Sequence, residues 1–555
     1  MAFQLSPGVN VSEVDLTTVV PAVATTIGGL AGNFAWGPVE EIVNISNEIR
    51  LAETFGKPDS NTFQYFFTAA NFLSYGSNLR VVRSANTGSL NATTSGVGVQ
   101  IKNLNDYEQN HSDGSGNDDF VSKYPGALGN ALTVSISDAN THSTWVYSGN
   151  FDGAPSTSDY VSSKNGSNDE LHIVVVDRTG QITGTANTVI ERFGYISKAS
   201  DAKNSDGSTN YYKDVINSRS RYVWWTGHNE DGVNWGNESS GTTFNSLTGV
   251  DTFNLAGAVD APLTTGDITT SYDYFSNSDS VDVSLLMSGP TTNSVVPNHL
   301  IAIAESRKDC LVFVSPLQSD VVDNFGSEAT SIVATRNTYT SSSYAVMDSG
   351  YKYQYDKYND VYRWVPLNGD IAGLTVRTDN ERDPWFSPAG FNRGAIKNVV
   401  KLAYNPSKND RDILYKVGVN SVVTFPGEGT VLYGDKTLLS RPSAFDRINV
   451  RRLFIVLEKS VARAARTTMF EFNDEFTRSQ FVNLVEPFLR DVQGRRGIFD
   501  FRVVCDTTNN TSEVIDRNEF VGDIYIKPAR SINFIQLNFV AVRTGVTFQE
   551  VVGQF

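Results

Sequence analysis

Few residues of this chain stand at spacings that could support catalysis. Its five histidines are scattered, and none forms an HExxH pattern or a paired His/Cys spacing, so no zinc site is predicted. Residues 427–429 (Gly-Glu-Gly) lack the later glycine of a dinucleotide loop. Residues 434–437 (Gly-Asp-Lys-Thr) place an aspartate where a phosphate loop needs glycine, and its charge would repel phosphate. We therefore predict no catalytic residue and no cofactor.

Residues 113–119 carry several oxygen-bearing side chains, as a calcium-binding loop would. The glycine and the closing glutamate of such a loop are absent, so a solvated loop is the favoured interpretation. No metal site is predicted.

The polar cluster that stands out is basic. Residues 441–466 hold seven Lys and Arg but only two acidic residues, and Lys459, Arg463 and Arg466 stand at i, i+4 and i+7. This spacing puts three cations on one face of a helix, opposite apolar residues. Such a face can dock on an acidic surface, although an ordinary solvated helix face is the alternative. Nucleic acid is disfavoured, because exposed aromatic residues are not interleaved and the chain as a whole is acidic.

Charge is distributed unevenly along the 555 residues, which carry a net charge of −16. Residues 86–280 have 10 Lys and Arg against 23 Asp and Glu, a net charge of −13, whereas residues 396–555 have 22 against 18, a net charge of +4. This asymmetry indicates a solvated acidic region and a C-terminal part that faces an acidic partner.

Composition predicts a folded, multidomain protein. A chain of this length exceeds what one hydrophobic core serves, so about three or four domains are expected. No segment reaches the ~18 apolar residues of a membrane span, and the start lacks a secretion signal, so we expect no direct membrane insertion and synthesis in cytoplasm. Cys310 and Cys505 stand in apolar, strand-like runs and suit reduced core thiols.

Both ends of the chain read as strand-forming arms, over residues 1–21 and about 543–555. Period-two apolar alternation marks each of them. A terminal strand must pair within its own fold, be shielded, or add to the sheet edge of a neighbour. The residues that define the arms are Pro7, Gly8, Val9, Val11 and Val14 at the front, and Val546 and Phe548 at the back.

Between the arms, the pattern predicts a mixed α+β fold. A helix over 62–75 and a strand over 79–83 precede a polar, β-rich insertion at 86–280, with short strands such as 132–136 and 172–176. Residues 281–316 read as a β-α-β unit, which favours a parallel strand pair. The C-terminal part carries the clearest helices, over 410–417, over 453–468, and from about 477 to a stop at Gly494.

Several longer motifs point to one family. They run collinearly through the chain and include KYQYDKYND at 352–360, RWVPL at 363–367, FDRINVRRLF at 445–454 and VCDTTNNT at 504–511. The chain therefore resembles the tail sheath proteins of T4-like contractile phages over residues 1–85 and 281–555. The resemblance is weaker over 86–280, which looks shorter than in the T4 sheath and suggests a reduced outer domain.

The resemblance implies a structural, non-enzymatic subunit of the virion tail. Sheath subunits stack as hexameric rings in a helical tube around an inner tail tube, and contraction drives that tube through the host envelope for genome ejection. Partners would be further copies joined by arm exchange, the tail tube protein, and the baseplate and tail terminator proteins, with no nucleic acid. Lys459, Arg463 and Arg466 become candidates for contact with the tube.

The same resemblance implies a domain plan. The arm at 1–21 would pair with the C-terminal domain of neighbours, 22–85 plus 281–395 would form an α/β sheath domain, 86–280 a β-rich acidic outer domain, and 396–555 an inner α+β domain carrying the second arm. Two other functions stay open. One is the sheath of a related contractile injection system, such as a secretion system or a bacteriocin. The other is a glycan-binding tail protein, which the Tyr- and Trp-bearing stretch 211–236 would serve.

Overall fold

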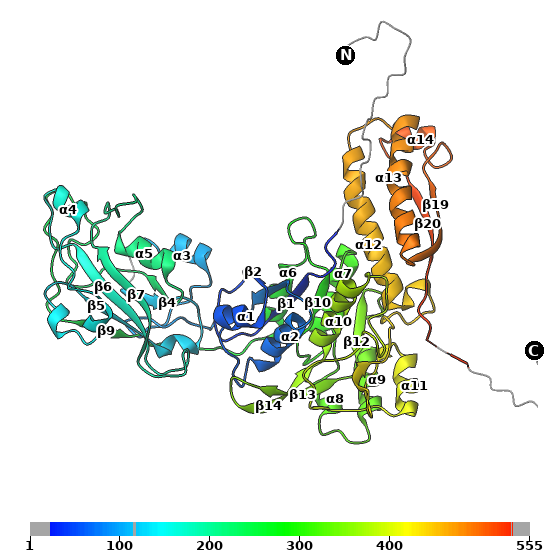
Figure 1. The fold of residues 1–555 in the computed structure, drawn as a ribbon, viewed down its shortest axis with the longest axis horizontal. Helices are drawn as coiled ribbons and strands as arrows, with labels where there is room; N and C mark the ends of the chain where they lie inside the picture. Colours follow the sequence, from blue (N-terminus) through cyan, green and yellow to red (C-terminus); the bar gives the residue numbers. More distant parts are fainter. Residues whose placement is uncertain (1–22, 115–117, 534, 537–555) are drawn as a thin grey trace, which may run out of the picture.

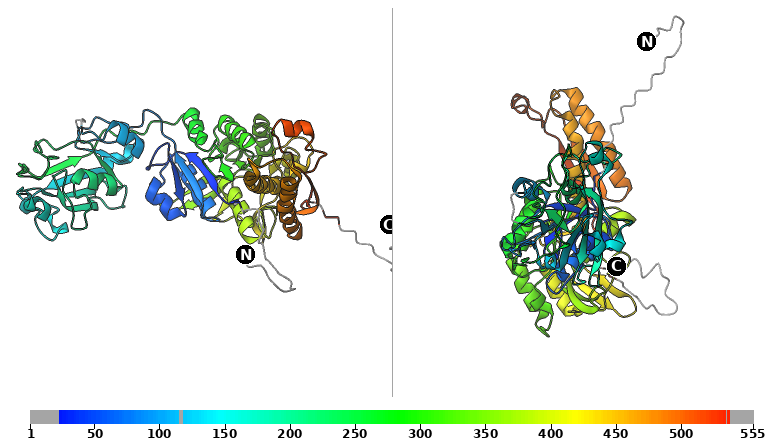
Figure 2. Two further views of the ribbon diagram at one scale, coloured as in Figure 1. Left: turned by 90° about the horizontal axis from the view of Figure 1, so that it is seen from above. Right: turned by 90° about the vertical axis from the view of Figure 1, so that its left-hand side faces the viewer.

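The computed structural model describes residues 23–114, 118–533 and 535–536. Figure 1 shows three regions in a row: a β-rich region at one end, a layered α/β region in the middle, and a C-terminal region of long helices beside a small sheet. The view from above in Figure 2 shows the same elongated order. The fold is multidomain and mixes helices with several sheets, as predicted.

A seven-stranded sheet forms the middle region, in the order β16-β12-β11-β10-β1-β3-β2. All neighbouring strands run parallel except β2, which is antiparallel to β3. The parallel pair predicted within residues 281–316 is confirmed as β10 and β11. The strands are β1 (Gly28–Gly32), β2 (Ile42–Ile45), β3 (Leu79–Arg83), β10 (Leu285–Met287), β11 (Leu311–Val314), β12 (Ala345–Asp348) and β16 (Val419–Asn420).

Helices cover both faces of this sheet, so most residues of its strands are buried and apolar. Successive strand residues alternate between two cores: Leu30 packs on the face covered by α2 and α10, and Ala31 on the face covered by α6, α7 and α9. The helices of this region are α1 (Glu48–Phe55), α2 (Phe63–Leu73), α6 (Thr265–Asp273), α7 (Val295–Arg307), α8 (Gln318–Val321), α9 (Glu328–Thr338), α10 (Asn368–Glu381) and α11 (Lys408–Lys416).

Glycines in β1 let aromatic rings lie against the strand. A Cβ at Gly28 would come 2.5 Å from the Phe72 ring, and one at Gly32 would come 2.0 Å from Tyr65. Larger residues at these positions would push α2 off the sheet, because real Cβ atoms do not approach so closely.

Three small sheets extend the molecule. A three-stranded sheet contains β14 (Val361–Pro366), β13 (Tyr351–Asp356) and β15 (Lys401–Leu402), and a hairpin contains β17 (Val422–Phe425) and β18 (Gly429–Leu432). β15 and β16 lie inside the predicted 396–555 domain but pair with strands of the middle region. The third small sheet, β19 (Ile498–Val504) and β20 (Asp523–Pro528), belongs to the C-terminal region with α12 (Ile448–Ala465), α13 (Glu475–Gly494) and α14 (Ser512–Asp516).

A buried ion pair joins β13 to the first turn of α10. Lys352 Nζ lies 2.9 Å from Asp370 Oδ1, and both side chains are fully buried. Burial lowers the pKa of Lys352 and raises that of Asp370. Tyr75 of the segment after α2 also bonds to Asp370, at 3.2 Å. The cluster fixes β13, α10 and the end of α2 relative to one another. Losing one partner would leave a buried charge.

The β-rich region contains an antiparallel sheet in the order β7-β6-β5-β9. The strands predicted near 132–136 and 172–176 are confirmed as β5 and β6. Its elements are β5 (Leu132–Ser137), β6 (Glu170–Asp177), β7 (Thr188–Ser197), β9 (Asp251–Asn254), the pair β4 (Phe120–Ser122) and β8 (Val223–Trp225), and the helices α3 (Leu104–Asn110), α4 (Asp159–Ser163) and α5 (Tyr212–Arg219).

The aromatic residues of 211–236 lie mostly in the core of this region. Five of them are buried, namely Tyr211, Tyr212, Trp224, Trp225 and Trp235. Trp225 Nε1 donates to the Tyr212 hydroxyl at 2.9 Å, as a buried indole requires. Most of the aromatic rings that suggested the glycan-binding alternative are therefore not exposed.

Asp348, at the end of β12, makes the free energy of unfolding depend on pH. It is 1% exposed, and burial raises its pKa to about 8. The folded protein therefore holds a proton that the unfolded chain loses at lower pH, so the free energy of unfolding should fall as pH rises, by at most about 1.4 kcal/mol per pH unit.

We expect Asp348→Asn to remove this pH dependence, because an amide does not titrate there. Between about pH 5 and pH 8 the wild type should lose stability relative to the variant, as measured by urea unfolding. Parallel pH profiles for the two proteins would contradict the assignment.

Candidate assembly interface

The predicted arm residues Pro7, Gly8, Val9, Val11, Val14, Val546 and Phe548 lie outside the described residues. What the structure places is the points where the two ends leave the folded body. Each point is held by a buried or half-buried charged cluster.

The N-terminal segment is fixed at Thr25 by an arginine of α12. Arg452 donates to the Thr25 carbonyl at 3.2 Å and makes a bidentate pair with Asp379 of α10, at 2.5 and 2.6 Å. The two charged side chains are only 5% and 3% exposed. Bidentate guanidinium–carboxylate pairs are among the strongest hydrogen-bonded contacts in proteins. Thr25, Asp379 and Arg452 therefore join three segments that are far apart in sequence. We call this cluster the clasp.

The C-terminal segment is fixed at Asp435. Ser531 donates to Asp435 Oδ2, and Asn533 Nδ2 lies 3.1 Å from Oδ1. Asn533 also bonds to the Tyr415 hydroxyl, and Arg447 lies 3.6 Å from the same carboxylate. Asp435 is the residue whose charge excluded a phosphate loop at 434–437. In the fold it anchors the last described part of the chain.

The sheet of β19 and β20 offers open edges close to these anchors. β19 pairs with β20 and, within residues 118–533, with no other strand. α13 covers one face of the sheet, where Phe481, Val485 and Leu489 pack with Phe501 and Ile526. Unpaired edge groups make a ready template for an added strand. The small sheet can therefore accept extended segments of another chain along either edge.

The basic face predicted on α12 lies against acidic residues of its own chain. Lys459 pairs with Asp282, and Arg466, in the turn after α12, lies 3.3 Å from Asp279. Lys459 is only 13% exposed, whereas Arg466 is 70% exposed. Arg463 is exposed on the same helix. The structure thus brings two of the three predicted cations to one acidic loop, and a contact with a separate protein stays a prediction.

Sequence reasoning missed the acidic partners of this site. Asp379, Asp282 and Asp279 lie 73 to 187 positions away from the cations that they bind. Their only signal in the sequence was a negative charge, which 61 Asp and Glu residues share.

Two other kinds of site are absent from the described residues. No group of three or more His, Cys, Asp or Glu side chains there is placed to hold a metal ion. No helix among those residues has the length and apolarity to cross a membrane. Cys310 and Cys505 are buried and not bonded to each other.

Family models match most of the chain. "Tail sheath protein Gp18 domain III N-terminal region" matches residues 25–83, "Phage tail sheath protein central domain" matches 263–438, and "Phage tail sheath C-terminal domain" matches 440–541. The matches cover the middle and C-terminal regions. The β-rich region lies between the first two of them.

Two relatives align over nearly their whole length. The tail sheath protein of Enterobacteria phage T4 is 35% identical over 669 aligned positions, covering 99% of each chain. That of Vibrio phage KVP40 is also 35% identical, covering 99% of this chain and 100% of the relative. The T4 alignment is longer than the present chain, so the relative has insertions that this protein lacks.

Solved structures share the fold at low identity. A sheath tail protein from Desulfitobacterium hafniense gives a TM-score of 0.54 at 12% identity, covering 94% of this chain and 100% of that one. The helical sheath of the anti-feeding prophage in its contracted state gives 0.51 at 12% identity, covering 97% and 99%.

The clasp generates a stability prediction. We expect Asp379→Ala to lower the free energy of unfolding by about 3 to 5 kcal/mol, because it leaves the Arg452 guanidinium buried without its counter-charge. Urea unfolding of the full chain would measure this loss. The matched control is Glu486→Ala, which breaks the exposed i,i+4 pair with Arg490. It should cost less than about 0.5 kcal/mol. Equal losses in the two variants would contradict the role assigned to the clasp.

Proposed function

The chain belongs to the phage tail sheath protein family and is a subunit of a contractile tail sheath, and we propose that its copies stack as hexameric rings in a helix around an inner tail tube. The observation that carries this function is 35% identity to the T4 tail sheath protein over 99% of both chains. On contraction the sheath drives the tube through the host envelope for genome ejection. The protein is accordingly a component of the virion tail.

The role is structural and not enzymatic. The family models that match are those of a structural protein. In support, the buried charged clusters described above each join separate segments of the fold: Arg452 and Asp379 join α12 to α10, and Lys352 and Asp370 join β13 to α10. A carboxylate used in this way is held by its partner and is poorly suited to move protons.

Subunits are joined by strand exchange. The arm at 1–21 and the arm at 543–555 add to the open edges of β19 and β20 in neighbouring copies. Contacts between unlike surfaces of identical subunits generate closed rings where the rotation closes and helical assemblies where it does not. The two anchors support this proposal, because an arm that carries load between subunits needs a firm attachment at Thr25 and at Asp435.

The α12 side of the subunit faces the tail tube, and the acidic insertion at 86–280 faces outward. The net charge of +4 over 396–555 and of −13 over 86–280 supports this orientation. Figure 1 places the β-rich region and α12 at opposite ends of the molecule. The baseplate and the tail terminator meet the two ends of the polymer.

Deleting an arm should abolish polymerisation. We expect the chain without residues 1–20, and the chain without everything after Arg543, to remain folded but to form no tubes, because each deletion removes one set of added strands. Electron microscopy of the purified proteins, with circular dichroism as the folding control, would measure this. Long tubes from either deletion would rule out strand exchange, and failure of the full chain to form tubes would count against the polymer itself.

The proposed contact between α12 and the tail tube can be tested by reversing the charge of its three cations. Replacing Lys459, Arg463 and Arg466 together with Glu should impair assembly of the extended sheath around the tube, because repulsion replaces contacts of about 0.2 to 1 kcal/mol each, repeated in every ring. Co-assembly with the tube, imaged by electron microscopy, is the measurement.

The matched control is the double variant Asp279→Asn and Asp282→Asn. It breaks the intrachain pairs of Lys459 and Arg466 but keeps all three cations, so it should still assemble around the tube. If both variants fail alike, the cations serve only the fold of the subunit.

A further inference from the structure

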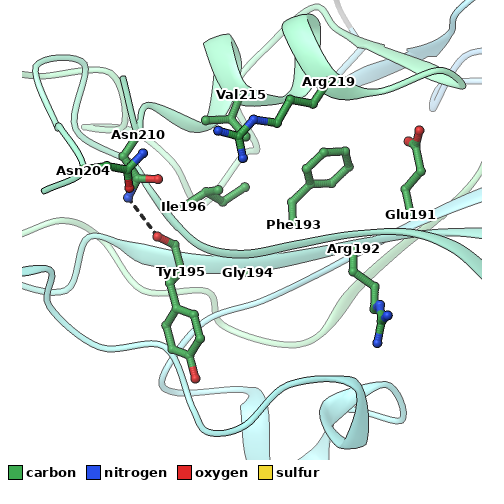
Figure 3. A pocket seen from close by; sticks show the side chains of 10 residues that line it. All are labelled: Glu191, Arg192, Phe193, Gly194, Tyr195, Ile196, Asn204, Asn210, Val215 and Arg219. Atoms are coloured by element: carbon green, nitrogen blue, oxygen red, sulfur yellow. Dashed lines mark hydrogen bonds between the residues drawn. The ribbon is translucent and has the colours of Figure 1, made fainter. Parts of the chain in front are cut away.

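A pocket of about 410 Å³ opens beside β7, the edge strand of the β-rich region (Figure 3). Residues 191–196 of β7 line it, together with Val215 and Arg219 of α5 and with Asn204 and Asn210 of the loop between them. A volume of this size falls within the range of small-molecule sites. No part of the sheath function described above uses it.

The backbone of β7 is irregular at this pocket. Leu171 pairs with Ile196 and Ile173 with Phe193, so Gly194 and Tyr195 together oppose one residue of β6. This is a β-bulge, and Tyr195 within it has φ of 56°, a left-handed conformation that a tyrosine rarely adopts. Bulges and strained residues of this kind concentrate at binding sites. In Figure 3 the bulge sends Tyr195 and Arg192 to the side of the strand away from α5.

The free charge at the α5 side of the pocket is positive. Arg219 is exposed and has neither a hydrogen bond nor an ion pair with the described residues, and Figure 3 shows its guanidinium reaching along α5 over Val215 toward Asn204 and Asn210. The lining carboxylate, Glu191, is already engaged: its oxygens accept from Ser220 Oγ at 2.6 Å and from the Arg221 amide at 2.7 Å. Asp206, in the same loop as Asn204 and Asn210, interacts electrostatically with Arg219 but makes no ion pair with it, so the guanidinium can still bind an anion.

The remaining lining atoms suit hydroxyl groups and an apolar ring face. The amide nitrogens of Asn204 and Asn210 are used, on Ser208 Oγ at 3.1 Å and on the Tyr195 carbonyl at 2.9 Å. Their side-chain oxygens have no partner among the described residues and can accept from hydroxyls. Phe193, Val215 and Ile196 supply apolar surface between these oxygens and Glu191.

We propose that this pocket binds a carboxylated sugar, with its carboxylate on Arg219 and its hydroxyls on the amide oxygens of Asn204 and Asn210. A neutral sugar would leave Arg219 without a direct ion pair, since Asp206 acts on it only at longer range, and a simple anion would leave the two amide oxygens without donors. The site lies in the β-rich region, at the opposite end of the molecule from α12, so binding should not depend on polymerisation.

The test is a titration of the full chain with D-glucuronate, followed by saturation-transfer NMR and calorimetry, with D-glucose and inorganic phosphate as comparison ligands. Glucuronate should bind at least about tenfold more tightly than either, since charge-assisted bonds and hydroxyl contacts are both needed. Arg219→Gln should weaken glucuronate about tenfold or more.

Arg192→Gln is the matched control. This variant also removes one positive charge, from β7 beside the pocket. The Arg192 side chain points away from α5, so the affinity for glucuronate should change less than about twofold. No glucuronate binding, equal binding of glucose or phosphate, or equal losses in the two variants would each overturn the proposal. Arg219→Gln should still form tubes with the arms intact, which separates this result from the fate of the sheath function.

Discussion

The bidentate pair between Arg452 and Asp379 is the interaction on which the arrangement of the molecule depends. It joins α12 of the C-terminal region to α10 of the central layers, and the same guanidinium holds the N-terminal segment at Thr25. Because both charges are almost fully buried, neither can be released into water without a large cost. The pair therefore ties the two regions and the segment at Thr25 to one another.

The open edges of the sheet of β19 and β20 are a second feature on which assembly would depend. Among the described residues the sheet of β19 and β20 has two strands, and an isolated pair of strands is marginal in water unless other elements support it. α13 supports one face, and added strands from neighbouring copies would complete the edges. In most proteins an open edge is an aggregation hazard. If neighbouring copies exchange strands as proposed, the same property would serve assembly, because each added strand joins one copy to the next.

The β-rich region differs from the other two in its core and in its surface charge. Its core contains many of its own aromatic residues, and its net charge of −13 favours a solvated surface. Within that surface Arg219 stands beside a pocket with no direct ion pair to the described residues, although ten cations share the region with 23 carboxylates. If the region takes no part in assembly, as proposed, a binding site there leaves the polymer undisturbed.

The sequence alone determined the fold class, the parallel pair in 281–316, the strands β5 and β6 and the end of α13 at Gly494, because periodicity and turn residues act locally. It also carried the family resemblance, through motifs that do not depend on contacts. Only the tertiary structure decided that β16 joins the central sheet, that Asp435 anchors the chain end, and that Asp282 and Asp279 lie against the cations of α12. These pairings link residues tens to hundreds of positions apart, and no local pattern distinguishes one carboxylate from another until the chain has folded.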